Sequence, residues 1–348
     1  MSAAADTGAP AQPALTEPFR IGDVEIDNRV LLAPLAGIGN WFVRTQARRH
    51  GAGLAVSEMV SSHAIYHRNE RTLRELLVIR PDEHPVSMQL FGADPDVMRE
   101  AAAVVAETGA DLIDLNMGCP VRKVLKTGAG AQLIADPDLA VAVAAAAVEG
   151  AQGKPVTVKL RSGLKPADTS GVAVAERLVA EAGVAAIAFH PRSAAVGHKG
   201  KPDYELAREL GARIEVPVII SGGLATAEKA RIAYERSGAD AVMIARGSLG
   251  YPWIFEELTG ARSEPPSRQE IVTELLWVMD RAEEHFGERA GRYMRKFYPW
   301  YLERLGAGRD QSEAFQRADD IDDVREMARV LAEREPATAG GEPVPALR

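Results

Sequence analysis

The single cysteine of the chain, Cys119, lies in the segment Asn116-Met117-Gly118-Cys119-Pro120, which follows a short apolar run. A lone cysteine is usually a small buried hydrophobe. An unperturbed thiol has a pKa of about 8.5, so it is mostly protonated at neutral pH and can donate a proton as well as attack. Because proline stiffens this loop beside other polar side chains that end apolar runs, we interpret Cys119 as a catalytic residue.

Four more polar side chains follow apolar runs and have two interpretations each. Lys159 either extends from the mouth of a barrel or faces a ligand that carries or develops negative charge. His190 is either a hydrogen-bonded core histidine or a donor to a ligand carbonyl or phosphate. Gln89 either fills the interior or offers a donor and an acceptor to an imide edge. Glu58 could simply pair with a neighbouring base.

Glycines mark the loops after the last two apolar runs. Ser221-Gly222-Gly223 follows the seventh run, and Gly247 follows the eighth beside the cation Arg246. In parallel barrels these two loops often form a phosphate site from backbone N–H groups and a helix N-terminus. Turns also need glycine for conformational reasons alone, but this position in the chain favours phosphate binding.

Eight short β-type runs position these residues: Val30–Ala33, Leu54–Ser57, Val86–Gln89, Leu112–Leu115, Val156–Lys159, Ala186–Phe189, Val218–Ile220 and Ala241–Ile244. Helix-type segments fill the gaps; three of them begin at Asp94, Asp136 and Thr226 and end near Gly109, Gly150 and Gly238. Apolar strands that alternate with helices indicate a parallel sheet buried on both faces. Eight such units predict a (β/α)8 TIM barrel, whose strand ends open on one face. An open doubly wound sheet is the alternative, disfavoured because no G-x-G-x-x-G follows the first strand.

A small all-helical domain is predicted to follow the barrel, because apolar residues recur there at helical spacings. These residues are Ile271, Leu275, Val278, Met279 and Ala282. We predict a disordered lead over 1–18, the barrel over 19–260, a linker over 261–267, the helical domain over 268–335 and a disordered tail over 336–348.

The composition narrows the class of protein. The 348 residues include 41 Lys and Arg against 49 Asp and Glu, so the formal net charge is 41 − 49 = −8. One cysteine excludes an internal disulfide framework and a Cys-rich metal site, and we expect no metal. The chain begins without the basic and apolar regions of a leader. Its longest apolar run, Leu139–Val148, is about half the length that crosses a bilayer. We expect a cytoplasmic monomer without a membrane partner.

A basic stretch near the end of the chain could hold an acidic partner despite the overall negative charge. Between 289 and 304 the bases are Arg289, Arg292, Arg295, Lys296 and Arg304, against the single acid Glu303. The spacing of Arg289, Arg292 and Lys296 predicts one basic helix face. The interleaved aromatic residues either contact nucleic acid or pack on the barrel.

Six short motifs stand in order along the chain: Leu32-Ala33-Pro34-Leu35-Ala36-Gly37, Ser87-Met88-Gln89-Leu90-Phe91-Gly92, Asp114-Leu115-Asn116-Met117-Gly118-Cys119-Pro120, Lys159-Leu160-Arg161, His190-Pro191-Arg192 and Tyr251-Pro252-Trp253-Ile254-Phe255. Together they resemble the motifs of the tRNA-dihydrouridine synthases, with the closest likeness to the bacterial type B group. The likeness covers roughly residues 20–305, and its asparagine–glycine–cysteine–proline segment is rather specific to that family.

The resemblance implies an FMN-binding barrel, a helical tRNA-binding domain, and NADPH-driven reduction of the C5–C6 double bond of a specific uridine in tRNA to 5,6-dihydrouridine. It implies hydride transfer from FMN N5 to C6 and protonation of C5 by Cys119. The implied FMN contacts are Pro34, Leu35, Ala36, Gln89, Lys159, His190, Ser221, Gly222, Gly223, Ala245 and Arg246. The implied substrate and RNA contacts are Asn116, Arg161, Arg192, Arg289, Arg292, Arg295 and Lys296, with His190 also near the base.

The chain departs from the family pattern in three places. Ser221-Gly222-Gly223-Leu224 replaces a common asparagine–glycine–aspartate–isoleucine, Pro191 replaces a glycine, and Asn40 replaces a frequent aspartate. The first departure leaves the choice of tRNA site open. Two other hypotheses for the function also stay open. One is an FMN-dependent barrel oxidoreductase that acts on a free small molecule such as a pyrimidine or an enone, which would not require the basic stretch. The other is an RNA-binding, chaperone-like protein without chemistry, which Cys119 and Lys159 disfavour.

Overall fold

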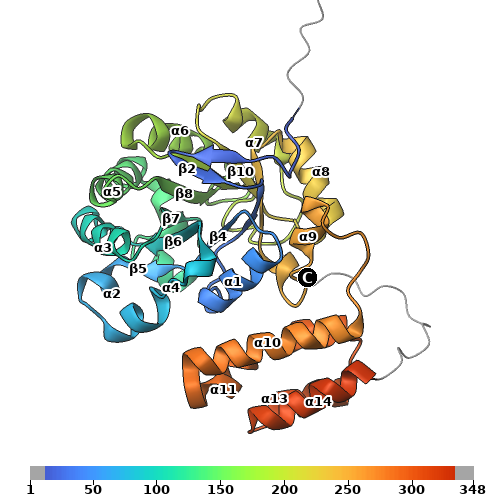
Figure 1. Ribbon diagram of the computed structural model, residues 1–348. Helices are drawn as coiled ribbons and strands as arrows, with labels where there is room; N and C mark the ends of the chain where they lie inside the picture. The colour runs from blue at the N-terminus through green and yellow to red at the C-terminus, as the bar shows by residue number, and fades with distance from the viewer. Residues whose placement is uncertain (1–11, 334–348) are drawn as a thin grey trace, which may run out of the picture.

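Eight parallel strands form a closed barrel (Figure 1). The computed structural model describes residues 12–333. The ring consists of β3 (Val30–Leu32), β4 (Leu54–Val56), β6 (Val86–Phe91), β7 (Leu112–Met117), β8 (Val156–Arg161), β9 (Ala186–His190), β10 (Val218–Ser221) and β11 (Ala241–Ile244). The ring closes because β11 pairs with β3 and β4 pairs with β6. The predicted (β/α)8 barrel is therefore confirmed, and the open-sheet alternative is wrong.

Helices cover the outside of the ring (Figure 1). They are α1 (Trp41–Arg49), α3 (Pro95–Glu107), α5 (Pro137–Gly150), α6 (Ser170–Ala182), α7 (Tyr204–Gly211), α8 (Ala227–Ser237) and α9 (Ile254–Thr259), with the short α2 (Ser62–Tyr66) and α4 (Arg122–Leu125) in loops. The side chains of Asp94, Asp136 and Thr226 accept hydrogen bonds from N–H groups in the first turns of α3, α5 and α8. These caps satisfy backbone donors that the helix itself leaves unpaired. The three helices predicted from the capping residues are confirmed.

Three elements escape the sequence analysis. Strands β1 (Phe19–Ile21) and β2 (Val24–Ile26) form an antiparallel hairpin, and β5 (Val60–Ser61) pairs with β6. Residues 12–18 were expected to be disordered, but they contact the barrel. The Gln12 amide donates to the carbonyls of Tyr234 and Ala239, and Leu15 is buried. Residues 1–11 and 334–348, which hold the rest of the expected lead and the tail, lie outside the described residues.

A helical region follows a segment at 260–267 that contains neither helix nor strand. It consists of α10 (Arg268–Phe286), α11 (Ala290–Met294), α12 (Tyr298–Arg304), α13 (Arg309–Arg317) and α14 (Ile321–Glu333), and it lies beside the barrel (Figure 1). Ser267 and Glu270 form a capping box at the start of α10. The five apolar residues predicted to share one face of this helix are all buried. Within residues 12–333, no helix is long and apolar enough to span a bilayer.

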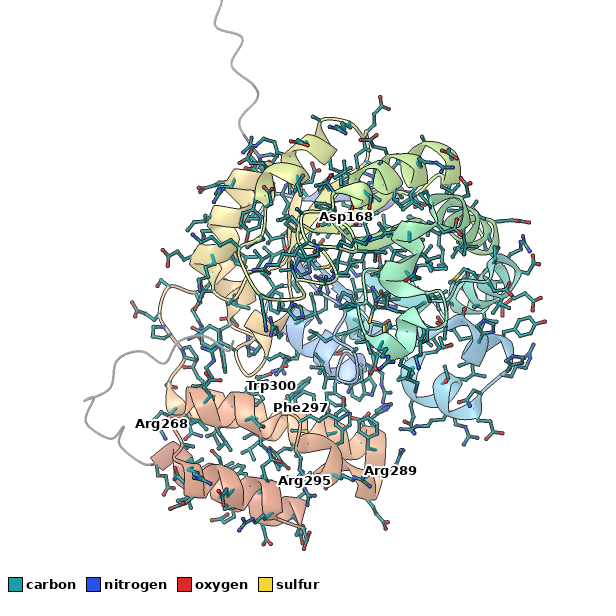
Figure 2. All side chains as sticks on the ribbon, turned by 180° about the vertical axis from the view of Figure 1, so that it is seen from behind. Asp168, Arg268, Arg289, Arg295, Phe297 and Trp300 are labelled. Carbon is teal, nitrogen blue, oxygen red and sulfur yellow. The ribbon has the colours of Figure 1, made fainter. Side chains whose placement is uncertain are left out.

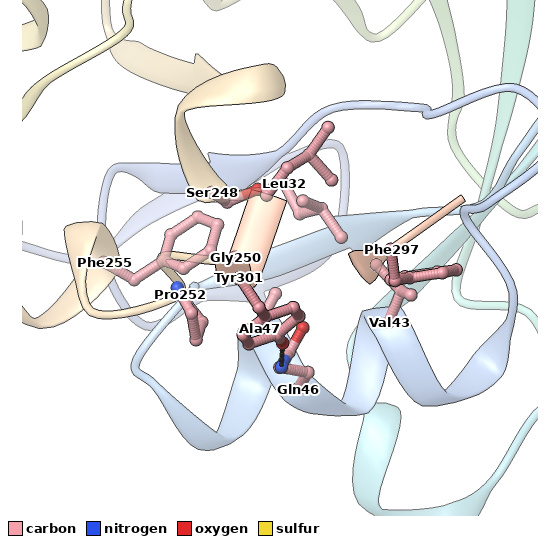
Figure 3. Close-up of a pocket in the computed structure, with 11 residues that line it drawn as sticks. Leu32, Val43, Gln46, Ala47, Ser248, Gly250, Pro252, Phe255, Phe297 and Tyr301 are labelled. Carbon is pink, nitrogen blue, oxygen red and sulfur yellow. Dashed lines mark hydrogen bonds between the residues drawn. The ribbon is translucent and has the colours of Figure 1, made fainter. Parts of the chain in front are cut away.

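A buried polar contact joins α1 of the barrel to the helical region. The Gln46 amide donates to the Glu274 carboxylate and to the Tyr301 hydroxyl, each at 2.9 Å. A cavity of about 10 Å³, lined by Gln46, Tyr301 and Phe297 among others, lies at this contact (Figure 3). Nearby, Nε2 of His50 at the end of α1 lies 3.5 Å from a carboxylate oxygen of Glu274 on α10. Because buried polar groups are costly unless they are paired, these contacts define how the two parts dock.

A second buried polar contact fixes the loop after β3. Arg44 on α1 donates from Nε to the Glu83 carboxylate at 2.5 Å, and the two side chains are 1% and 0% exposed. The same guanidinium donates to the carbonyls of Gly39 at 3.1 Å and Val78 at 2.6 Å. Arg44 thereby links the loop that begins at Ala33 to the segment before β6.

Candidate active site

The polar residues at the strand ends converge on one cavity of about 550 Å³ at the carboxyl ends of the strands. Fourteen of the residues implied as cofactor, catalytic or substrate contacts line this cavity: Pro34, Leu35, Ala36, Gln89, Asn116, Cys119, Lys159, Arg161, His190, Ser221, Gly222, Gly223, Ala245 and Arg246. Gly247 and Arg304, which the sequence also singled out, line it as well. The lining does not include Glu58, Arg192 or the basic residues between 289 and 296. The chain thus brings the thiol, the buried cation and the glycine loops to one place.

The loop after β7 presents the Cys119 thiol to the cavity. The side-chain oxygen of Asn116 accepts hydrogen bonds from the backbone N–H groups of Gly118 at 3.2 Å and Cys119 at 2.9 Å. The carbonyl of Cys119 accepts a hydrogen bond from Ala131 at 3.1 Å. The thiol is half-buried. Since Asn116 uses its oxygen on the loop backbone, it positions Cys119 in addition to lining the cavity.

A buried hydrogen-bonded chain supports this loop from below. Thr157 and Gln89 each donate to a different oxygen of the Asp114 carboxylate at 2.6 Å. Asn116 then donates to the amide oxygen of Gln89 at 2.9 Å. An ionised carboxylate only accepts hydrogen bonds, so Asp114 fixes the amide orientation of Gln89 and, through it, that of Asn116. The sequence analysis did not identify Asp114 as a site residue, because one acid inside an apolar run has no distinctive spacing.

The buried carboxyl of Asp114 should make the stability of the protein depend on pH. Burial raises the pKa of this carboxyl from 3.8 to about 6, against the opposing effect of the Thr157 and Gln89 hydrogen bonds. The folded state therefore holds a proton that the unfolded state releases, so Asp114 contributes stability at low pH that is lost as the pH rises from about 4 to 6. We expect Asp114→Asn to remove this part of the decline. Urea unfolding of both proteins at several pH values measures it, and parallel pH profiles would contradict it.

The loop after β10 forms a cradle that only glycine fits. Gly222 has a φ of +95°, and a Cβ atom there would come within 2.3 Å of the His190 ring. Gly223 has a φ of +85°. This loop leads into α8, whose first turn carries Lys229, and the Lys159 ammonium donates to the Ser221 hydroxyl at 3.3 Å. Backbone N–H groups next to a helix N-terminus favour an anion.

The charges that line the cavity are predominantly positive. The cations are Lys159, Arg161, Lys229, Arg246 and Arg304, and Glu303 is the one acid among the described residues of the lining. Burial and then the neighbouring Arg161 lower the pKa of Lys159 to about 8, which leaves it mostly protonated at neutral pH. Burial and the surrounding cations hold the pKa of His190 well below its ordinary value, so this histidine is neutral. The cavity is therefore suited to an anionic ligand.

Two predicted RNA-contacting arginines are engaged with backbone carbonyls. Arg161 donates to the carbonyl of Gly118 at 2.9 Å and to that of Gly197 at 2.9 Å. Arg192 donates to the carbonyl of Gly200 at 2.8 Å. His198 from the same loop stacks near His190 with a centroid distance of 6.0 Å and lines the cavity, although the sequence analysis did not single it out.

The single basic helix face predicted between 289 and 296 is wrong, because α11 spans only Ala290–Met294. Arg289 lies in a 3-10 turn (Gly287–Arg289), Arg292 lies on α11, and Lys296 lies beyond the end of α11. Figure 2 shows Arg289 and Arg295 on the helical region. A periodic pattern alone cannot detect such a break, since it assumes a continuous helix.

Most of these bases already have partners. Arg289 forms an ion pair with Glu75 at 2.8 Å, and Arg295 donates to the Ala318 carbonyl at 3.1 Å. Arg292 is exposed, and no ion pair forms at its side chain among residues 12–333. Of the interleaved aromatics, Phe297, Tyr298 and Tyr301 are buried, and Tyr293 and Trp300 are partly buried. Phe297 packs on Phe42 of the barrel as one of the two interpretations expected, whereas Tyr298 packs on Phe315 within the helical region.

The loop after β3 contacts the helical region through Gly37. Lys296 donates to the Gly37 carbonyl at 3.0 Å, and the Glu58 carboxylate accepts a hydrogen bond from the Gly37 N–H at 2.8 Å. Burial raises the pKa of Glu58. Glu58 therefore holds the backbone of the loop that carries Pro34–Ala36, and the structure favours a supporting role for it.

Comparisons with known proteins agree with this geometry. A family model described as dihydrouridine synthase matches residues 31–336. A protein named tRNA-dihydrouridine synthase B from Pseudomonas aeruginosa is 37% identical over 309 residues, which cover 87% of this chain and 92% of that protein. A relative of the same name from Shewanella oneidensis is 35% identical, with coverage of 82% and 90%.

Solved structures with the same barrel have low sequence identity. A 2-naphthoyl-CoA reductase complex superposes with a TM-score of 0.55 at 15% identity, covering 71% of this chain and 52% of that one. Morphinone reductase superposes with a TM-score of 0.51 at 15% identity, covering 75% of this chain and 93% of that one. At such identities these likenesses establish the shared barrel fold.

Proposed function

Since the chain belongs to the dihydrouridine synthase family, we propose that it reduces the C5–C6 double bond of a uridine in tRNA to 5,6-dihydrouridine, with FMN as cofactor and NADPH as reductant. The observation that carries this proposal is that one cavity holds both the Cys119 thiol and the cationic glycine loops after β10 and β11. A proton donor and an anion cradle in the same cavity are what the reaction requires of the protein.

The residues present fit a flavin mononucleotide. The cavity volume of about 550 Å³, the left-handed Gly222 and Gly223, and the excess of cations suit a nucleotide-sized anion. The phosphate would be held by Ser221–Gly223, Ala245 and Arg246, and the ring system by Pro34–Ala36, Gln89, Lys159 and His190. Bound FMN supplies the hydride for the uracil ring. Lys159 contributes a buried positive charge, and charge near a flavin is one way in which proteins tune its chemistry.

Cys119 is the proposed proton donor to C5 of the uracil. Its thiol reaches the cavity, and the side-chain oxygen of Asn116 accepts hydrogen bonds from the backbone N–H groups of Gly118 and Cys119. The neutral His190 and the amide of Asn116 are proposed to contact the base and nearby groups. Arg161 and Arg192 are proposed to act here through the loops whose carbonyls they bind.

The RNA has to expose its target before this chemistry. A uridine inside folded tRNA must swing out into the cavity, which costs a few kcal/mol. We propose that the helical region over 268–333 binds tRNA with Arg292, Arg289, Arg295 and Lys296. Such contacts to phosphates should weaken steeply with salt.

The test is to incubate the purified protein with NADPH and an in vitro transcribed tRNA and to map dihydrouridine in the product. We expect conversion at a specific uridine, and the loss of the same modification from RNA of a deletion strain. Unmodified tRNA in vitro, together with unchanged dihydrouridine in the RNA of the deletion strain, would overturn the proposal. Reduction of free uridine but not of tRNA would instead favour an oxidoreductase that acts on a small molecule.

A further inference from the structure

Three neighbouring loops at the mouth of the cavity carry exposed bases. We call these six residues the basic arc: Arg122, Lys123 and Lys126 after β7, Lys165 after β8, and Lys199 and Lys201 after β9. The strands β7, β8 and β9 are adjacent in the barrel, so their loops form one continuous segment of the rim. Pro120 and His198, which flank the arc bases in sequence, line the cavity itself. The arc therefore borders the opening directly.

The basic arc has no acidic counterpart of its own. Residues 115–135 and 190–202 contain no Asp or Glu, although the whole chain has a net charge of −8. The loop after β8 contains Asp168, but its carboxylate accepts backbone hydrogen bonds from Leu164 at 2.7 Å and Ser170 at 2.9 Å. Within residues 12–333, none of the six arc side chains forms an ion pair, in contrast to Arg289 and Arg325 of the helical region.

The arc is held together before any ligand binds. The Arg161 guanidinium bridges the loops after β7 and β9 by binding the carbonyls of Gly118 and Gly197, each at 2.9 Å. The backbone N–H of Ala194 donates to the carbonyl of Gly163 at 2.8 Å and joins the loop after β9 to that after β8. A cationic surface whose loops are already joined loses less conformational freedom on binding than one made of separate, mobile loops.

The arc faces the helical region across the cavity mouth. Around the ring, β8 is reached from β3 through β4, β6 and β7 in one direction and through β11, β10 and β9 in the other, so the two strands are diametrically opposed. The loop after β3 is the one that contacts Lys296 of the helical region. Figure 2 agrees, since Asp168 lies far across the barrel from Arg289 and Arg295.

We propose that the basic arc binds the backbone phosphates of an RNA strand next to the nucleotide that enters the cavity. The proposal rests on the proposed function and adds a second RNA surface opposite the helical region. Unpaired, exposed lysines and arginines bind phosphates by releasing counterions, without regard to base sequence. A free pyrimidine has no flanking phosphates, so the arc favours a polynucleotide substrate.

The test compares two triple charge reversals with the same change in net charge. The arc variant is Lys123→Glu, Lys126→Glu and Lys199→Glu. The control is Arg20→Glu, Lys154→Glu and Arg213→Glu, three positions at the amino-terminal end of the barrel. Binding of an in vitro transcribed tRNA is measured over a range of salt concentrations. We expect the arc variant to bind at least about tenfold more weakly at physiological salt, and the slope of log affinity against log salt to fall by about two.

Matching circular dichroism spectra and melting curves show that the variants are folded, and a milder Lys→Gln triple at the same arc positions should lose affinity in the same direction. The arc proposal is overturned if the folded arc variants keep the wild-type affinity and salt slope, or if the control loses as much affinity as they do. Product formation by the wild-type protein would still support the proposed function in either case. A wild-type protein that neither binds nor modifies tRNA would overturn both.

Discussion

Replacement of Cys119 by alanine is expected to lower dihydrouridine formation by about 10²–10⁴-fold, the usual contribution of a positioned general acid. The thiol lines the cavity and is half-buried, and alanine cannot deliver a proton from the same place. The loop should persist, because Asn116 binds the backbone N–H groups of Gly118 and Cys119 and not the sulfur. The variant should therefore keep its yellow colour and still oxidise NADPH.

Mass spectrometry of the tRNA measures the product, and absorbance follows NADPH oxidation in the same sample. Thr127→Ala is a matched control, since Thr127 lies on the same loop but outside the lining of the cavity. We expect near-normal yield from that control. A normal product yield from Cys119→Ala would remove the thiol from the proposed role.

Replacement of Arg44 by methionine is expected to lower the free energy of unfolding by about 3–5 kcal/mol, because it leaves a buried carboxylate without its partner. Glu83 is fully buried, and Arg44 also satisfies the carbonyls of Gly39 and Val78. Urea unfolding measures the loss. The matched control is Arg20→Met at the exposed pair with Glu25, where roughly 0–1 kcal/mol is expected. Equal small losses in both variants would contradict the argument.

The pH dependence of the Arg44→Met variant gives an independent check. Burial already raises the pKa of Glu83 above 4.5, and the Arg44 guanidinium opposes that rise. Without Arg44 the folded-state pKa rises further, so the folded protein binds a proton that the unfolded chain releases. Stability then falls as the pH rises above the unfolded value, and the variant should regain part of its stability in acid. Adding Glu83→Gln should remove this dependence.

The barrel could be predicted from the sequence because its strands are buried on both faces, and each therefore appears as a continuous apolar run. Val156–Lys159 and Val218–Ile220 are clear examples, and β8 and β10 lie there. The hairpin β1–β2 could not be predicted in this way, since two strands of three residues have too little pattern. The spacing of Arg289, Arg292 and Lys296 was misleading because it assumes one continuous helix, whereas α11 covers only Ala290–Met294.

The sequence predicts those site residues that directly follow a strand, because the ends of parallel strands in a barrel meet on one face. Cys119, Lys159 and the Ser221–Gly223 loop line the cavity for that reason. Asp114 and His198 escaped because their importance depends on which side chains meet them in space. The hydrogen bond from Gln89 on the neighbouring strand and the packing of the loop after β9, which brings His198 against His190, leave no trace in the order of residues.

The contact of Gln46 with Glu274 and Tyr301 has a consequence for how an RNA would be measured. This buried contact fixes the distance and angle between the barrel and the helical region before an RNA binds. When the helical region holds one part of a folded RNA, only a nucleotide at a matching distance from that part reaches the cavity. Substitutions at Gln46, Glu274 or Tyr301 would then direct the enzyme to a uridine at a different position in the RNA, while the chemistry in the cavity stayed the same.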